Sequence, residues 1–241
     1  MFVMIESAAL SDIGKVRKAN EDFFSENQEM GLWIVADGVG GNGHGDVASQ
    51  VVVQTVERRV RQGRSVQEAI MDAHDTLHKV AEADPDYSGM ATTVVVCRLQ
   101  DNIYEISWVG DSRAYLWNGS VLYRLTKDHN YAQQMVEDNE LQPEEAFRHP
   151  MRHLLMHAVG SGEPELLRID TISGSLEAND TLLLCTDGLC GEVSDGEMKA
   201  VLQDADKSIK EKCSILLNKA LDAGGGDNIT LTLLKFLVNR S

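Results

Sequence analysis

Positive charge is scarce in this chain of 241 residues, because 22 Lys and Arg face 38 Asp and Glu and give a net charge of −16. The phosphate backbone of a nucleic acid would be repelled by such a protein, so we expect no nucleic-acid partner. Long apolar runs are also missing, and no stretch approaches the length that spans a bilayer. The opening residues, MFVMIESAAL, lack the basic start and long apolar core of a secretory signal. We therefore expect no membrane partner.

Cysteine is rare and follows no ligand pattern. The four cysteines, Cys97, Cys185, Cys190 and Cys213, form no Cys-x-x-Cys pair, and three of them lie inside apolar periodic segments. Buried free thiols in a reducing compartment fit this distribution, so we expect a cytoplasmic protein. The hydrophobic share of 43% is ordinary for a globular protein and supports a sizeable core.

The order of apolar patterns predicts the fold class. Asp101-Asn102 and Asn118-Gly119 each separate two strand-like runs, which indicates two hairpins. Helical stripes come in two pairs, one starting near 45 and 65 and one near 195 and 207. Strands are expected over 2–10, 22–26, 31–37, 91–99, 103–109, 113–117, 121–125, 165–172, 180–186 and 229–238. Paired helices with hairpins favour an α+β fold in which helix pairs cover antiparallel sheets. The polar, His- and Met-rich stretch 128–163 predicts a small flap within one domain over 1–241.

Three apolar strands in the sequence stop at an aspartate. Asp37, Asp111 and Asp187 each follow such a run, and a fourth acidic site, Asp227-Asn228, opens the last run. A single Asp after a strand is usually only part of a turn. Carboxylates that converge at one rim of a sheet repel one another unless hard cations lie between them, and oxygen-rich sites suit Mg²⁺ or Mn²⁺. The four positions together therefore predict a metal-dependent enzyme.

Two loops add to this interpretation. The glycine-rich loop DGVGGNGHG lacks the Gly-Lys-Ser/Thr of a nucleotide-binding P-loop, so we reject nucleotide binding there. A second loop, around Arg17, is basic and suits an anion clamp. A metal site beside an anion clamp is the equipment for phosphoryl hydrolysis.

Seven motifs in this order resemble the metal-dependent protein phosphatases of type 2C, in their bacterial branch. The resemblance runs through nearly the whole chain and implies two antiparallel sheets in a sandwich flanked by pairs of antiparallel helices. It rests on Arg17-Lys18-Ala19-Asn20-Glu21-Asp22, Asp37-Gly38-Val39-Gly40-Gly41, Gly89-Met90-Ala91-Thr92-Thr93, Gly110-Asp111-Ser112-Arg113-Ala114-Tyr115, Leu125-Thr126-Lys127-Asp128-His129, Thr186-Asp187-Gly188-Leu189 and Gly224-Gly225-Gly226-Asp227-Asn228-Ile229-Thr230.

The resemblance also implies metal ligands. Asp37 resembles the carboxylate that bridges two ions, with the Gly38 carbonyl as a further ligand. Asp187 and Asp227 resemble ligands of the second ion. Asp111, together with Asp187, resembles the site of a third and weaker cation.

Other positions resemble supporting groups. Glu21 and Asp22 are expected to hold metal-bound water, directly or from behind the ligands, and Asn228 to orient Asp227. Arg17 resembles the phosphate clamp, for which its planar fork of donors is suited. Members often carry a histidine directly after Gly-Gly or after Asp-Gly, but this chain has Asn42 and Val39 there. His44, two residues later, is the candidate proton donor.

The implied activity is hydrolysis of phosphoserine and phosphothreonine in proteins, by a hydroxide that bridges two Mn²⁺ or Mg²⁺ ions. The expected partners are phosphorylated proteins and a separate serine/threonine kinase, by analogy with regulators of type VI secretion, and the expected state is a monomer. The alternatives are a phosphatase of small molecules and a non-catalytic phospho-reader. A reader would lack a metal ligand, whereas all the aspartates are present here.

Two further histidine groups have helical spacing. They are His74 with His78, and His149, His153 and His157. Asp75 stands where a zinc-peptidase pattern needs a glutamate, and Pro150 disrupts the other group. We therefore favour polar positions beside an apolar stripe for the first group and a solvated surface for the second, rather than metal sites.

Overall fold

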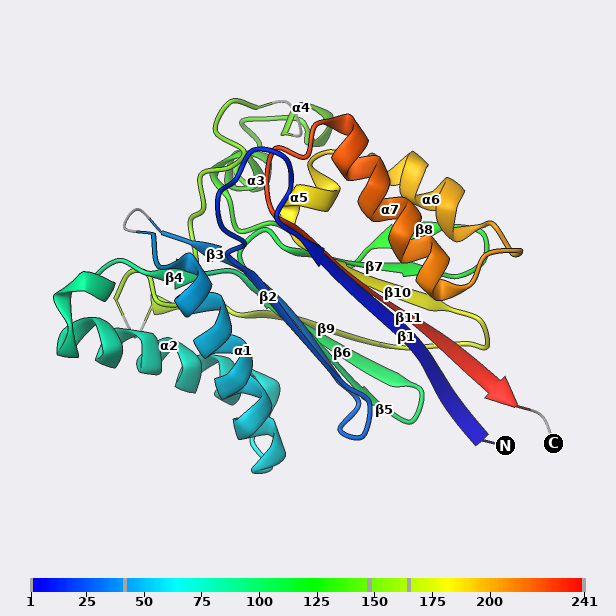
Figure 1. The fold of residues 1–241 in the computed structure, drawn as a ribbon, viewed down its shortest axis with the longest axis horizontal. Coiled ribbons are helices and arrows are strands. Elements are labelled where there is room, and N and C mark those ends of the chain that lie inside the picture. Colours follow the sequence, from blue (N-terminus) through cyan, green and yellow to red (C-terminus); the bar gives the residue numbers. More distant parts are fainter. Residues whose placement is uncertain (1, 41–42, 147–148, 164–165, 240–241) are drawn as a thin grey trace.

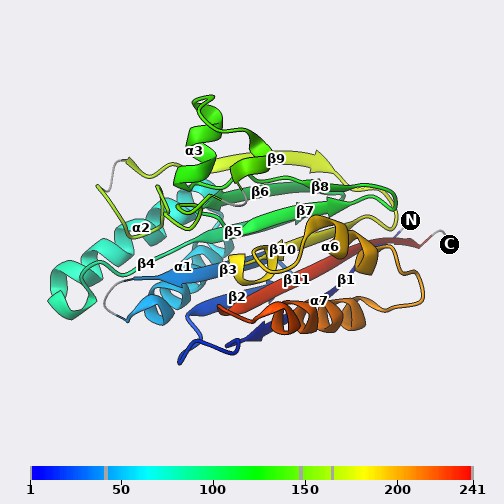
Figure 2. The same ribbon diagram turned by 90° about the horizontal axis from the view of Figure 1, so that it is seen from above.

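The computed structural model describes residues 2–40, 43–146, 149–163 and 166–239. Their strands form two antiparallel sheets, which confirms the predicted fold class (Figures 1 and 2). The first sheet runs in the order β1 (Phe2–Asp12), β11 (Ile229–Asn239), β10 (Thr181–Cys185), β7 (Arg113–Trp117) and β8 (Leu122–Arg124). The second runs β2 (Asp22–Asn27), β3 (Leu32–Val39), β5 (Val94–Gln100), β6 (Ile103–Val109) and β9 (Asp170–Ser175), with β4 (Ala91–Thr92) paired to β3.

A pair of helices covers the outer face of each sheet, as predicted (Figure 1). Helices α1 (Gly45–Arg61) and α2 (Val66–Ala83) pack on the second sheet, and α6 (Asp195–Leu202) and α7 (Ile209–Ala223) pack on the first. Three of these helices begin at a serine whose hydroxyl and partner glutamate form a capping box. Each box satisfies backbone N–H groups that the first helical turn leaves free, which explains where the helix starts.

The sandwich has three apolar layers rather than one. On β3, Leu32 and Ile34 point toward α1 and α2, whereas Trp33 and Val35 lie between the two sheets. The same alternation divides β10 and β11 between the inter-sheet core and the layer under α6 and α7. Strands buried on both faces need apolar residues at every position, so their sequences read as continuous runs without alternation.

The described part of the flap predicted over 128–163 contains the short helices α3 (Tyr131–Glu137) and α4 (Pro143–Ala146), and Figure 2 shows α3 beside the start of β9. One backbone bridge, Asn130 with Leu155, joins the two ends of the flap to each other, and another, Thr92 with Val159, joins the end of the flap to β4. The flap therefore returns to the body of the protein close to β4.

Three sequence-based assignments need correction. The strand expected over 165–172 is β9, Asp170–Ser175, while Leu167 and Ile169 of the apolar run pack under the helices instead. The strand expected over 91–99 is interrupted at Thr93, which separates β4 from β5. The short helices η1 (Pro85–Tyr87) and α5 (Asp187–Cys190) were missed, because a single turn leaves no periodicity to detect. In the described residues, no helix combines the length and the apolar character needed to cross a membrane.

Candidate metal centre and phosphate site

Aspartates from both sheets meet at one rim of the sandwich. Asp37 lies near the end of β3, Asp111 follows β6, Asp187 begins α5 directly after β10, and Asp227 precedes β11. A cavity of about 500 Å³ opens at this rim. Its lining includes Arg17, Glu21, Asp37, Gly38, Asp111, Asp187 and Asp227. The structure thus places these expected site residues around one space.

Asp22 lies behind this lining and is nearly inaccessible to solvent. It pairs with Asp37 across the β2–β3 ladder, and Thr186 Oγ1 donates a hydrogen bond of 3.0 Å to its Oδ2. Its Oδ1 and the Oδ1 of Asp187 are buried and have no hydrogen-bond partner among the described residues. A buried carboxylate oxygen without a donor is costly, so both atoms point to a cation or water that completes the site.

The crowding of carboxylates changes their titration. Burial and then the charges of Asp22 and Asp187 raise the pKa of Asp37 well above its usual range, although Asp37 keeps some exposed surface at the cavity. Burial and then the charge of Asp187 raise the pKa of Asp111 in the same way. Burial raises the pKa of Asp22 to about 7. Removing positive charge from this rim therefore favours protonation, and bound cations would reverse that preference.

The backbone around Asp37 is held by two threonines of the Gly-Met-Ala-Thr-Thr motif. Thr92 Oγ1 donates to the Asp37 carbonyl at 2.8 Å, and the Asp37 N–H donates to Thr93 Oγ1 at 3.1 Å. Gly38 has no room for a side chain, because a Cβ there would overlap the Gly45 carbonyl at the start of α1. These contacts fix the Asp37-Gly38 segment against two neighbouring elements.

Asn228 ties the first loop of the chain to the last strand. Its side-chain oxygen accepts from the Glu21 N–H at 2.8 Å, and its Nδ2 donates to the carbonyls of Ile13 and Ala19 at 2.9 and 3.0 Å. The Asn228 N–H in turn donates to Asp227 Oδ1 at 2.8 Å. One amide therefore positions both the loop that carries Arg17 and the adjacent aspartate.

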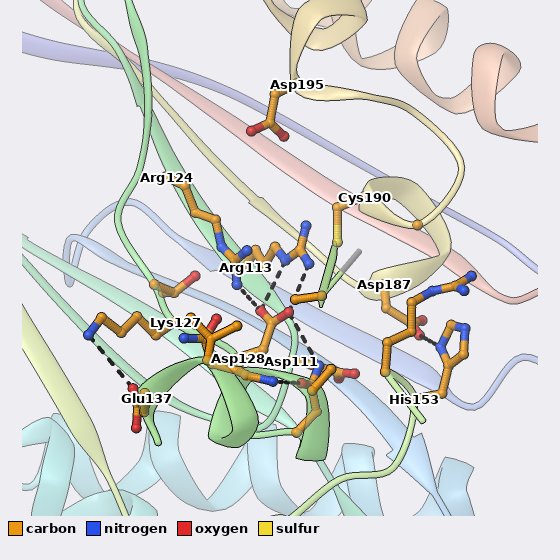
Figure 3. Close-up of a pocket in the computed structure, with 18 of the residues that line it drawn as sticks. Asp111, Arg113, Arg124, Lys127, Asp128, Glu137, His153, Asp187, Cys190 and Asp195 are labelled. Atoms are coloured by element: carbon orange, nitrogen blue, oxygen red, sulfur yellow. Dashed lines mark hydrogen bonds and ion pairs between the residues drawn. The ribbon is translucent and has the colours of Figure 1, made fainter. Parts of the chain in front are cut away.

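Two basic groups contact the aspartates at the cavity. Arg17 Nη2 lies 2.6 Å from Asp227 Oδ2, and this arginine side chain is 53% exposed. His153 of the flap lies with Nδ1 3.5 Å from Asp187 Oδ2 (Figure 3). His153 and the neighbouring Arg152 also line the cavity. Sequence reasoning treated His153 as a surface residue, because nothing in its local pattern indicates a contact with α5.

His44 lies elsewhere. Its ring packs against Tyr87, with ring centroids 4.8 Å apart, and it is not part of the cavity lining. Gly41 and Asn42, which precede it in the glycine-rich loop, lie outside the described residues. The structure therefore does not bring His44 together with the aspartates.

The donor set fits hard divalent cations. The atoms available at the rim are carboxylate oxygens and the Gly38 carbonyl, which are the ligands that Mg²⁺ and Mn²⁺ prefer. Over the described ranges, no group of three or more His, Cys, Asp and Glu side chains is placed so that it could hold a metal ion. A Mg²⁺-type site needs only one or two carboxylates, because water fills the other positions around the ion.

Comparison with known proteins gives a family and relatives. Residues 15–222 match the protein phosphatase 2C family. The serine/threonine phosphatase stp of Listeria innocua serovar 6a is 33% identical over 239 residues, which cover 93% of each chain. The similarity therefore extends over nearly the full length of both sequences.

Solved structures show the same likeness in three dimensions. PppA, described as a key regulatory component of T6SS in Pseudomonas aeruginosa, has a TM-score of 0.85 and 30% identity, covering 97% of this chain and 98% of its own. The catalytic domain of the serine/threonine phosphatase PstP, crystallised with two manganese ions, has a TM-score of 0.86 and 30% identity, covering 98% of this chain and 100% of its own.

Proposed function

Because the chain belongs to the protein phosphatase 2C family, we propose that it is a serine/threonine protein phosphatase that depends on divalent cations. The observation that carries this proposal is the convergence of Asp37, Asp111, Asp187 and Asp227 beside Arg17 at one cavity. Burial and mutual repulsion raise the pKa of two of these carboxylates, Asp37 and Asp111, as expected for a site built around positive ions.

The residues that would hold the cations follow from their place at the rim. Asp37 and Gly38 line the cavity together with the other groups. We assign Asp37 to both ions as the bridging carboxylate, with the Gly38 carbonyl as a further ligand, and Asp187 and Asp227 to the second ion. Glu21 and Asp22 would accept hydrogen bonds from coordinated water. Asp111 and Asp187 would hold a third, weaker ion, and burial and then the charge of Asp187 raise the pKa of Asp111. Bound cations supply acidified water as the nucleophile and neutralise charge on the phosphoryl oxygens.

Arg17 is the group that would bind the substrate phosphoryl. Its guanidinium is half exposed at the cavity and makes one short ion pair, with Asp227. A planar fork of donors can bind two phosphoryl oxygens at once, so a phosphate competes with Asp227 for the same N–H groups. The Asn228 side chain holds the backbone on both sides of Arg17, at Ile13 and Ala19, and the Asn228 N–H holds the Asp227 carboxylate, so this residue limits the distance between clamp and ligand.

Two features support a polypeptide rather than a small phosphate ester as the substrate. The relatives named above are serine/threonine phosphatases. The cavity at the rim continues into a second cavity of about 760 Å³, with which it shares Asp111 and Asp187. A phosphate ester of a sugar would leave most of that second space empty. A non-catalytic reader is disfavoured, because each of the expected aspartates is present at the rim.

The partner of such an enzyme would be a separate serine/threonine kinase whose products it dephosphorylates. The similarity to PppA supports a role near a secretion system of that type. We propose that the chain acts as a monomer in the cytoplasm, where its four buried free cysteines would stay reduced. Light scattering of the purified protein with Mn²⁺ tests the monomer.

Hydrolysis of p-nitrophenyl phosphate, a phosphothreonine peptide and a sugar phosphate, each with Mn²⁺ and with excess chelator, tests the proposed function. We expect cation-dependent turnover of the first two and a much lower kcat/KM for the sugar phosphate. Asp37→Asn should abolish turnover and weaken Mn²⁺ binding in calorimetry. Asp101→Asn, the same change in the hairpin between β5 and β6, is the matched control and should alter neither. Turnover in chelator, or preference for the sugar phosphate, contradicts the proposal.

A further inference from the structure

A second cavity lies beside the metal centre, between β8, the flap helix α3 and the start of α6 (Figure 3). Its volume is about 760 Å³, which is larger than the rim cavity. Asp111, Asp187, Arg152 and His153 line both spaces, so a polypeptide bound at the metal centre can continue into this one. Ala132, Val136 and Ala146 of the flap contribute an apolar side. The opposite side is ionic.

The ionic side is organised by one buried aspartate. Asp128 accepts two hydrogen bonds from Arg113, from Nε at 3.0 Å and from Nη2 at 2.8 Å. Arg124 Nη2 donates to the Oδ1 of the same carboxylate. Burial alone would raise the pKa of Asp128, but the two arginines bring that pKa below its usual value. Asp128 therefore remains ionised between two guanidinium groups.

The two arginines differ in how much of the guanidinium group remains available to a ligand. Arg113 is committed, because its remaining Nη1 donates to Tyr115 Oη at 3.2 Å and its side chain is 15% exposed. Arg124 contacts Asp128 through one nitrogen, and its side chain is 29% exposed to the cavity. Two cations share one anion, so this group carries a net positive charge in a protein whose total charge is −16. Asp128 holds the Arg124 guanidinium in place, which lowers the entropy that a ligand must overcome.

The other charged side chains around the cavity do not neutralise the net positive charge of the Arg113–Asp128–Arg124 group. Lys127 Nζ lies 3.7 Å from Glu137, and that glutamate also lies 3.7 Å from Arg168. Asp195, at the N-terminus of α6, stands apart from the Arg113–Asp128–Arg124 group in Figure 3. The carboxylates of Asp111 and Asp187 belong to the cation site. The exposed donors of Arg124 are therefore the part of this wall that suits an anion.

We propose that this second cavity is a substrate subsite, in which Arg124 binds an anionic side chain that lies a few residues from the phosphoresidue. The ligand is a carboxylate or a second phosphoryl group on the same polypeptide. This inference rests on the proposed phosphatase function and adds a preference for acidic sequences around the hydrolysed residue. Arg113 and Asp128 position Arg124 and do not themselves contact the substrate.

Phosphothreonine peptides of equal length test the subsite. One series carries a single glutamate at successive positions around the phosphothreonine, a second carries phosphoserine there, and a third carries alanine. We expect kcat/KM to rise about five- to tenfold when the anion reaches Arg124, as a partly exposed charge-assisted pair gives. The glutamate and phosphoserine series distinguish a carboxylate from a phosphoryl ligand. Equal kcat/KM across all peptides overturns the proposal.

Variants of Arg124 test whether this residue causes the preference for acidic peptides. Arg124→Gln should reduce the ratio of kcat/KM between the best acidic peptide and the alanine peptide toward one, and Arg124→Lys should retain part of it. Arg61→Gln is the matched control, because Arg61 also pairs with an acid four residues away, Glu57, but lies on α1 away from both cavities. It should leave the ratio unchanged. A ratio that survives in Arg124→Gln assigns the preference elsewhere and overturns the role of Arg124.

Two results separate the subsite from the function on which it rests. Wild-type protein that hydrolyses p-nitrophenyl phosphate and all peptides alike retains the phosphatase function and excludes the subsite. Wild-type protein that hydrolyses none of them in Mn²⁺ excludes both. Thermal unfolding of each variant shows whether it is folded, and the wild-type peptide series stands even where a variant is not.

Discussion

Arg17 and Asp227 form an ion pair of 2.6 Å between side chains that are 210 residues apart in the sequence. The pair lies at the mouth of the rim cavity and joins the first loop of the protein to the segment before its last strand. Because the Asp227 carboxylate is also an expected metal ligand, Arg17 and a cation would compete for its oxygens. Substrate phosphate would supply Arg17 with a replacement anion.

Replacing Arg17 with alanine should lower kcat/KM for a phosphothreonine peptide by roughly ten- to a thousandfold, or ~1.4–4 kcal/mol, because the phosphoryl loses a bidentate partner. Mn²⁺ binding measured by calorimetry should persist. Arg17→Lys keeps the positive charge but loses the planar fork of donors, so its kcat/KM should lie between those of the wild type and Arg17→Ala. An unaltered kcat/KM in Arg17→Ala would show that the arginine is only a surface charge.

Adding Mn²⁺ should stabilise the fold. An ion that binds the native state at about one hundred times its Kd contributes about 2.7 kcal/mol, which corresponds to a rise in Tm of about 5–10 °C for a chain of this size. The measurement is differential scanning calorimetry with Mn²⁺ and with chelator. Asp187→Asn should reduce the rise. A melting curve that saturating Mn²⁺ does not move counts against a preformed cluster.

Without cations, stability should fall as pH rises through the range in which Asp22 titrates. Its folded pKa is raised to about 7, so between the unfolded pKa and pH 7 the native state binds more protons than the unfolded state. The free energy of unfolding then decreases with pH by up to about 1.4 kcal/mol per unit for one proton. Urea titrations in chelator between pH 5 and 7 measure this slope, and Asp22→Asn should reduce it, while Asp37 and Asp111, whose pKa values are also raised, contribute the remainder. A slope that Asp22→Asn leaves unchanged would assign the protons to other groups.

Asp111→Ala should lose most turnover while keeping the two tightly held ions. A third cation at Asp111 would have few protein ligands, so water would fill its remaining positions and its affinity would be low. The structure shows Arg113 paired with Asp128, so an Asp111–Arg113 contact is not what Asp111 provides. A phosphopeptide assay and calorimetric counting of bound Mn²⁺ check the prediction. Wild-type turnover, or loss of the two tight ions, contradicts the assignment.

His44→Gln should affect p-nitrophenyl phosphate and a phosphothreonine peptide equally. A proton donor matters most for the poor leaving group, but the His44 ring packs on Tyr87 and does not line the rim cavity. The ratio of the two kcat values is the measurement. A selective loss on the phosphothreonine peptide would restore His44 as the donor, as its place in the glycine-rich loop first suggested.

The sequence predicted those parts of the fold and site that depend on neighbours along the chain. Strands that end at Asp37, Asp111 and Asp187 are visible as apolar runs, and their shared rim follows from an antiparallel sandwich. β9 was misplaced because it is an edge strand with exposed polar residues, whereas the more apolar stretch before it packs under the helices.

Contacts made across the flap could not be predicted in this way. His153 of the flap reaches Asp187, which lies 34 positions later in the sequence, and Asp128 bonds Arg113 of the neighbouring strand β7. Hydrophobic periodicity carries no information about such contacts. His44 shows the converse, because a residue close to a motif in the sequence can pack against another side chain, here Tyr87, and take no part in the cavity lining.

The last strand of the chain lies inside the first sheet. β11 is inserted between β1 and β10, and it pairs with β1 along its whole length, from Phe2 with Asn239 to Asp12 with Ile229. During synthesis β1 therefore emerges long before its partner exists, and Asp227 and Asn228 reach the rim only with that final strand. Until β11 has inserted between β1 and β10, Asp227 and Asn228 cannot reach the rim, so the cation site forms only after this pairing of distant strands.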